Sequence, residues 1–236
     1  MRQAFSASSR NRTRAVLFDL YGTLVPGGTP KERDDLAIEV ARDLDVDGVA
    51  LARLYRESFD QRARGLLGDV KTTLATFAGM LGSSPTDDDL MAAVKRRRDF
   101  TLALHKRTRV VPVLEHLRDS NLLLGLVTDC SAETTELWNV SPLARFIDAA
   151  SFSCEMGARK PHATMYLSVT DALNVECGEC LYVGDGGSNE LTGSVELGMR
   201  AIWFDDGAEL ERQNPELAWS GERITDLTML SGFLTN

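Results

Sequence analysis

Short apolar runs recur along the chain and are bounded by turn residues. The clearest lie at residues 15–20, 122–128, 181–184 and 201–204, and a weaker one lies near 146–153. Each run is short and apolar throughout, which is typical of a strand that is buried on both faces. Stretches with helical spacing separate the later runs. Because such strands alternate with helices in parallel sheets, the pattern predicts a doubly wound α/β fold.

Proline and glycine mark the helices expected between these strands. Pro112 and Pro161 each stand where a helix can begin, because proline suits the first helical turn. Gly198 stands just before the run at 201–204 and can end the preceding helix. The sequence therefore predicts one helix from each proline and another that ends at Gly198.

The first two apolar runs are separated by about 100 residues, far more than one crossover helix needs. Apolar residues in this gap recur at helical spacing. Thr29 and Glu32 can form a capping box around Pro30, and Thr86 precedes three aspartates that suit a helix start. The gap therefore predicts an all-helical module inserted into the α/β domain.

These patterns divide the chain into a core and an insertion. We expect residues 14–25 and 110–236 to form the α/β core, and residues 26–109 to form the helical module. Residues 1–13 are polar, basic and poor in apolar side chains, so we expect a flexible tail there.

Composition narrows the class of protein. The chain is 43% apolar and 26% charged, with a formal net charge of −9. The negative charge disfavours non-specific binding to nucleic acid and to anionic membranes. The basic run 95–98 wraps around a helix, which indicates a solvated face. Neither a signal-peptide pattern nor an apolar run of about 18 residues is present, so a cytoplasmic location is expected; the oligomeric state stays open.

Polar residues follow the apolar runs at the positions where a parallel sheet binds ligands. In such sheets the ligand lies outside the carboxyl ends of the strands. The candidate residues at these ends are Asp19, Thr128, Asp129, Lys160, Asp185, Asn189 and Glu190.

The types of these residues suit phosphoryl transfer. Asp19 can attack phosphorus to give an acyl-phosphate that water later cleaves. Thr128 can donate its hydroxyl to a phosphate oxygen, and Lys160 supplies a positive charge beside a helix N-terminus. Asp19 and Asp185 together form an oxygen-rich site suited to Mg²⁺. Glu190 can hold Lys160 and a metal-bound water from behind.

The order and spacing of these residues resemble the haloacid dehalogenase superfamily over nearly the whole chain. The matching motifs are Asp19-Leu-Tyr-Gly-Thr23, Thr128, Lys160-Pro161, and Gly184-Asp185 with Glu190. The resemblance implies a Rossmann-like core, a four-helix-type cap domain in the insertion, an aspartyl intermediate and Mg²⁺ as cofactor.

The candidate roles follow from these motifs. We expect Asp19, Thr128 and Lys160 to be catalytic. The expected metal contacts are Asp19, Asp185 and the backbone carbonyl of Tyr21, and the expected supporting residues behind them are Glu190 and Asn189.

Two residues depart from the pattern of the family's phosphatases. Tyr21 stands where a second Asp usually acts as general acid and base, and a phenol is a poor base at neutral pH. Asp129 stands where an Asn often follows the Ser/Thr, so its carboxylate either repels phosphate or points away. Both residues are possible substrate contacts.

These departures leave three functions open. The family's L-2-haloacid dehalogenases also carry a tyrosine at the position of Tyr21, because halide leaves without needing a proton. Asp185 with Glu190 resembles instead the metal-dependent branch of the family. The acidic motif weighs more, because a second buried carboxylate beside Asp19 is repulsive without a cation. We expect a Mg²⁺-dependent hydrolase of a small phosphorylated metabolite. The alternatives are a metal-independent 2-haloacid dehalogenase and a catalytically silent relative that binds a ligand.

Overall fold

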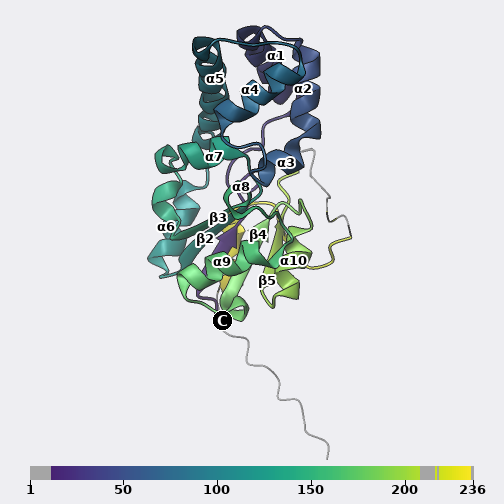
Figure 1. Ribbon diagram of the computed structural model, residues 1–236. Coiled ribbons are helices and arrows are strands. Elements are labelled where there is room, and N and C mark those ends of the chain that lie inside the picture. Colours follow the sequence, from purple (N-terminus) through teal and green to yellow (C-terminus); the bar gives the residue numbers. More distant parts are fainter. Residues whose placement is uncertain (1–11, 208–215, 217, 235–236) are drawn as a thin grey trace, which may run out of the picture.

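The computed structural model describes residues 12–207, 216 and 218–234 (Figure 1). Its centre is a sheet of parallel strands in the order β3-β2-β1-β4-β5-β6. The strands are β1 (Ala15–Phe18), β2 (Leu123–Thr128), β3 (Ala149–Phe152), β4 (Cys180–Gly184), β5 (Arg200–Phe204) and β6 (Glu222–Ile224). All five predicted apolar runs contain a strand, and the doubly wound α/β fold is confirmed.

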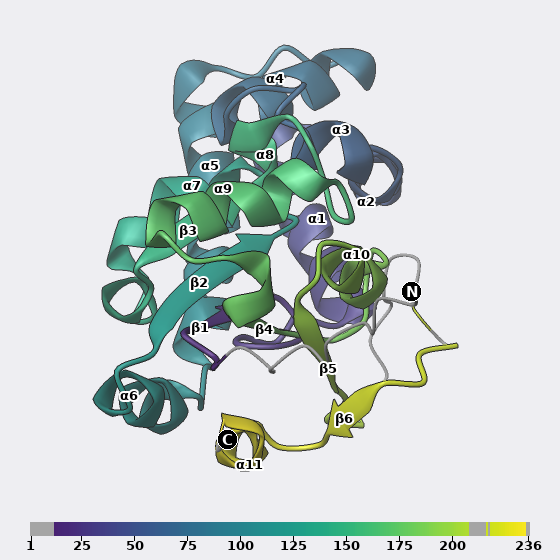
Figure 2. The same ribbon diagram turned by 90° about the horizontal axis from the view of Figure 1, so that it is seen from below.

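Helices of the core cover the sheet between and after these strands. The α-helices are α6 (Val111–Asp119), α7 (Ala132–Leu137), α8 (Ser153–Met156), α9 (Ala163–Leu173), α10 (Glu190–Glu196) and α11 (Ser231–Leu234). Short 3₁₀ turns are η1 (Trp138–Val140), η2 (Ala144–Phe146), η3 (Cys177–Glu179) and η4 (Leu227–Leu230). Figure 2 shows α9 and α10 on one side of the sheet and α6 and α11 on the other.

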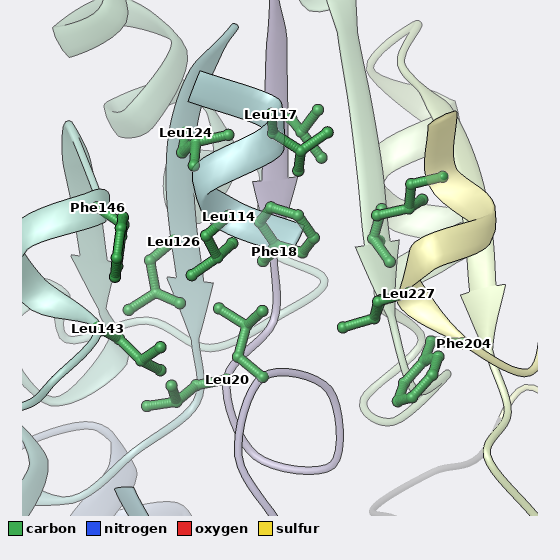
Figure 3. Packing of buried hydrophobic residues seen from close by; sticks show 14 of the residues in the cluster. Phe18, Leu20, Leu114, Leu117, Leu124, Leu126, Leu143, Phe146, Phe204 and Leu227 are labelled. Carbon is green, nitrogen blue, oxygen red and sulfur yellow. The ribbon is translucent and has the colours of Figure 1, made fainter. Parts of the chain in front are cut away.

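Side chains of β1 alternate between these two covered faces. Val16 and Phe18 belong to one apolar cluster, which includes residues of α6 and η4 (Figure 3). Ala15 and Leu17 belong to a second cluster, with residues of α9 and α10. Because both faces are buried, β1 is apolar at every position.

Two details of the core differ from the sequence pattern. The pattern does not predict β6, because this strand has only three residues and two of them are exposed. Helix α9 begins at Ala163, and Pro161 precedes it instead of opening its first turn. His162 caps this helix, since its Nδ1 accepts a hydrogen bond from the backbone N–H of Thr164 at 3.3 Å.

The insertion between β1 and β2 folds as a helical cap above the sheet (Figure 1). Its helices are α1 (Pro30–Leu44), α2 (Gly48–Glu57), α3 (Phe59–Ala63), α4 (Val70–Met80) and α5 (Asp87–Lys106). The expected capping box at Thr29 and Glu32 is present, and Thr86 forms another with Asp89. The cap has an apolar cluster of its own, to which α1, α2, α4 and α5 contribute.

Ion pairs between α5 and α7 join the cap to the core. Arg97 pairs with Glu133 at 2.7 Å, and Arg98 pairs with Glu136 at 2.5 Å. These contacts hold the cap over the carboxyl ends of the strands, where the site residues lie.

None of the helices within the described ranges is long and apolar enough to cross a membrane. Most of the tail predicted at residues 1–13 lies outside the described residues.

Candidate active site

Strand β1 leads directly to a buried carboxylate. The backbone N–H of Asp19 donates to the carbonyl of Val183 on β4 at 3.0 Å, and the Asp19 side chain is 6% exposed. Burial and the nearby Glu190 raise the pKa of Asp19 to about 7, although Lys160 lowers it. An ionised carboxylate in such a place is stable only with a cation beside it.

Lys160 provides one such cation. Its Nζ donates to Asp19 Oδ1 and, at 2.5 Å, to Glu190 Oε2. Burial disfavours the charged amine, but Asp19 and Glu190 together raise the pKa of Lys160 well above its ordinary value. The hydroxyl of Tyr182 also donates to Glu190 Oε2, at 2.9 Å. Glu190 therefore lies against Lys160, where the sequence predicts it.

Asp185 adds a further carboxylate to this cluster. One oxygen each from Asp19, Asp185 and Glu190 lie within 4.8 Å of one another, and all three residues are buried. The backbone N–H of Gly187 donates to Asp185 Oδ1, and that of Gly186 donates to Glu190 Oε1, both at 2.9 Å. Three carboxylates beside one lysine form a hard, negatively charged donor set. These residues therefore fit a Mg²⁺ ion.

Two glycines allow the carboxylates to approach so closely. Gly22 has a φ of +95°, and a Cβ built on it would lie 2.3 Å from Asp185 Oδ2. A Cβ on Gly184 would lie 2.1 Å from Glu190 Oε1. Since real contacts are never this short, any side chain at either position displaces a carboxylate of the cluster.

Thr128 has a buried hydroxyl at the end of the neighbouring strand. Its Oγ1 has no hydrogen-bond partner within the described part of the chain. Buried hydroxyls are normally bonded, so this oxygen is suited to a ligand. Asp19, Lys160 and Asp185 line a cavity of about 240 Å³ that extends up to the cap.

Two other predicted residues have different surroundings. Asp129 lines the cavity, but its Oδ1 accepts from the backbone N–H of Lys160 at 3.0 Å and its Oδ2 from Arg159 at 3.2 Å. Its carboxylate thus orients the loop that carries Lys160. Asn189 is exposed at the start of α10, and within the described ranges its side chain forms no hydrogen bond to the acidic cluster. Within the described residues, no contact of Asn189 therefore supports the role predicted for it behind the metal site.

Tyr21 lines the cavity with its hydroxyl already engaged. This oxygen lies 3.1 Å from His105 Nε2 and 2.9 Å from Thr134 Oγ1. Burial raises the pKa of Tyr21 above its ordinary value. Burial also lowers the pKa of His105 to about 4, so both side chains are neutral at pH 7. Neither group is suited to exchange a proton with substrate at that pH.

The cap lines the cavity with residues that the sequence pattern does not single out. Arg97 lies in the basic run 95–98, which is expected to face solvent. For Arg97 this expectation is wrong. Its side chain is 13% exposed and pairs with Glu133, which the core presents to this face of α5. The spacing carries the missed signal, since Arg97 lies four residues from both Ala93 and Thr101, which are buried.

Comparisons with known proteins agree with this architecture. Residues 13–194 match the model of the haloacid dehalogenase-like hydrolases. The chain is 26% identical to a glyceraldehyde 3-phosphate phosphatase from Methanopyrus kandleri over 212 residues. The aligned region covers 86% of this chain and 89% of that protein.

Solved structures of two activities are similar to this one. A 2-haloacid dehalogenase from Pseudomonas syringae is 25% identical, with a TM-score of 0.67. A HAD phosphatase from Thermococcus onnurineus is 22% identical, with a TM-score of 0.64. Each similarity covers 94% of this chain and 98% of the other.

The family match extends over most of the chain, and the matched region includes every predicted site residue from Asp19 to Glu190. The chain therefore belongs to the haloacid dehalogenase-like hydrolases and is an enzyme.

Proposed function

We propose that this enzyme is a Mg²⁺-dependent phosphatase that cleaves a small phosphate monoester through an aspartyl-phosphate intermediate. The observation that carries the proposal is the cluster of buried carboxylates, Asp19, Asp185 and Glu190, around Lys160. Acids packed beside a nucleophile repel it unless a cation is present. Halide displacement has no use for them, so the cluster favours phosphoryl transfer.

Asp19 is the nucleophile in this proposal. One of its carboxylate oxygens attacks phosphorus as the alcohol leaves, and water then hydrolyses the acyl-phosphate and regenerates the free carboxylate. Lys160 and Thr128 bind phosphate oxygens. Asp19, Asp185 and the carbonyl of Tyr21 would hold Mg²⁺, which when bound would supply positive charge to the transferred phosphoryl group.

The alcohol must leave without help from position 21. The hydroxyl of Tyr21 is held by His105 and Thr134, and a general acid is ordinarily worth about 10²–10⁴-fold in rate. We therefore expect aryl phosphates, whose leaving groups need no proton, to react much faster than alkyl phosphates. A series of esters measured at saturating Mg²⁺ tests this, and rates independent of leaving-group pKa would contradict it.

The relatives support a small substrate and also a second candidate function. A phosphatase named for glyceraldehyde 3-phosphate is similar over most of the chain, which favours a short phosphorylated metabolite. Tyr21 and the similarity to a 2-haloacid dehalogenase favour halide release as the second candidate. A catalytically silent relative that binds a ligand in the same cavity is the third.

One assay separates these functions. The assay measures phosphate release from glyceraldehyde 3-phosphate and from p-nitrophenyl phosphate, and halide release from 2-chloropropionate. Each rate is measured once with Mg²⁺ and once with EDTA. We expect phosphate release that EDTA abolishes and that Asp19→Asn lowers by several orders of magnitude. Asp119→Asn, at an exposed position on α6, should keep wild-type rates. Halide release that survives EDTA would establish the dehalogenase, and binding without turnover would establish the silent relative.

A further inference from the structure

The cap side of the cavity contains an arginine that, within the described part of the chain, forms no direct ion pair with a carboxylate. Arg62 of α3 lines the cavity and donates to three neutral oxygens. They are the carbonyl of Tyr55 at 2.7 Å, and the hydroxyls of Ser58 and Ser131, each at 3.2 Å. Within the described ranges, no carboxylate lies within 4.0 Å of the Arg62 guanidinium. A guanidinium between neutral oxygens leaves a positive charge facing the cavity.

Neighbouring arginines of the cavity are already paired. Arg97 forms its ion pair with Glu133, and Arg56 forms one with Asp34. Burial raises the pKa of Glu133, but Arg97 and Arg62 more than offset this effect and hold it at about 2. Glu133 is thus ionised and pairs directly with Arg97, while its charge also acts on Arg62. Two arginines therefore share one carboxylate, which leaves one net positive charge at this end of the cavity.

Tyr55 provides a second unsatisfied group beside Arg62. Its ring lies under two guanidinium groups, at 4.8 Å from Arg62 Cζ and 4.2 Å from Arg97 Cζ. Its hydroxyl is buried and has no hydrogen-bond partner among the residues that the structure describes. Tyr55 also lines the cavity next to Arg62, although its hydroxyl is buried in this structure.

We propose that Arg62 and Tyr55 bind a carboxylate on the leaving group, so that among alkyl phosphates the preferred substrates are short phosphorylated carboxylic acids. A guanidinium presents parallel donors that match a carboxylate, and a single added charge suits a monoanion better than a second phosphate. A cavity of about 240 Å³ limits the carbon chain to a few atoms. The inference rests on the proposed phosphatase function and adds the class of substrate.

The test compares esters that differ at one group. 3-Phosphoglycerate carries a carboxylate, whereas glycerol 3-phosphate carries a hydroxymethyl group in its place. We expect kcat/KM in wild type to be about 10- to 100-fold higher for 3-phosphoglycerate, because a charge-assisted hydrogen bond contributes about that factor. Arg62→Gln should lower kcat/KM for 3-phosphoglycerate about 10- to 100-fold, mainly through KM, and bring the ratio of kcat/KM between the two esters close to one.

Two further variants separate binding from folding. Tyr55→Phe deletes only the unpartnered hydroxyl, so it should lower kcat/KM for 3-phosphoglycerate about fivefold and leave the melting temperature unchanged. Arg53→Gln, on an arginine of α2 that is 72% exposed and paired with Glu57, should keep the wild-type preference. If Arg62→Gln melts at a much lower temperature, Tyr55→Phe alone decides.

Calorimetric binding keeps this inference distinct from the proposed function. If wild type releases phosphate equally from both esters, the carboxylate subsite is refuted while the phosphatase stands. If neither ester nor p-nitrophenyl phosphate is hydrolysed, the phosphatase fails. In that case, tighter binding of 3-phosphoglycerate than of glycerol 3-phosphate still supports the subsite, provided that Arg62→Gln abolishes the difference. A preference for 1,3-propanediol bisphosphate over 3-phosphoglycerate would overturn the assignment to a carboxylate.

Discussion

Gly22 decides how close Asp185 can come to Asp19. Because a Cβ there would lie 2.3 Å from Asp185 Oδ2, we expect Gly22→Ala to displace that carboxylate. Displacing a metal contact should weaken Mg²⁺ binding about 10- to 100-fold, with activity recovering only in part at high Mg²⁺. Phosphate release measured across a Mg²⁺ titration gives the affinity directly.

Gly198 provides a matched control for the backbone strain of this substitution. Its φ is +93°, close to that of Gly22, and apart from its chain neighbours no described residue has an atom within 4 Å of a Cβ built there. Gly198→Ala should therefore cost stability and leave the Mg²⁺ dependence unchanged. Equal Mg²⁺ affinity in Gly22→Ala and wild type would argue against Asp185 as a metal ligand.

Helix α5 contacts the core through a buried, neutral imidazole. His105 is fully buried, and burial lowers its pKa to about 4 from an ordinary value of 6.5. Because the pKa is lower in the folded state, this residue's contribution to stability is complete above pH 6.5 and is lost as the pH falls toward 4. A difference of this size amounts to about 3 kcal/mol in the free energy of unfolding.

We expect His105→Gln to lose less stability than wild type between pH 7 and pH 4.5. Glutamine keeps a partner for the Tyr21 hydroxyl and does not titrate. Urea unfolding at the two pH values measures the loss, and His116→Gln, at an exposed position on α6, should behave as wild type. An unchanged pH dependence in His105→Gln would mean that His105 titrates normally in the folded protein.

Local signals were sufficient for most elements of the fold. The strands at 15–20 and 181–184 are buried on both faces, so their apolar runs are unambiguous, and the capping box at Thr29 needs only adjacent residues. The strand β6 and the start of α9 were not predictable in this way. A short exposed edge strand has no apolar pattern. The start of α9 is capped by the side chain of His162, and whether a histidine acts as a cap depends on the conformation of the loop before it.

For the molecule as a whole, the core half of the site was more predictable than the cap half. Thr128 ends β2, while Asp19 and Asp185 directly follow β1 and β4, and a parallel sheet brings strand ends together whatever lies between them. The position of Arg62 depends instead on how α3 docks against the loop after β2, and that of Arg97 on how α5 docks against α7. No local pattern encodes that docking, which is why an inward-facing arginine looked like part of a solvated run.

The strand order also has a consequence for how the enzyme is made. β1 pairs with β4, and Ala15 lies opposite Cys180, so Asp19 and Asp185 meet only after residue 185 has been synthesised. On the ribosome, a nascent polypeptide that ends before Cys180 has Asp19 without its acidic neighbours. The complete acidic cluster therefore forms only after Glu190 has been added to the chain.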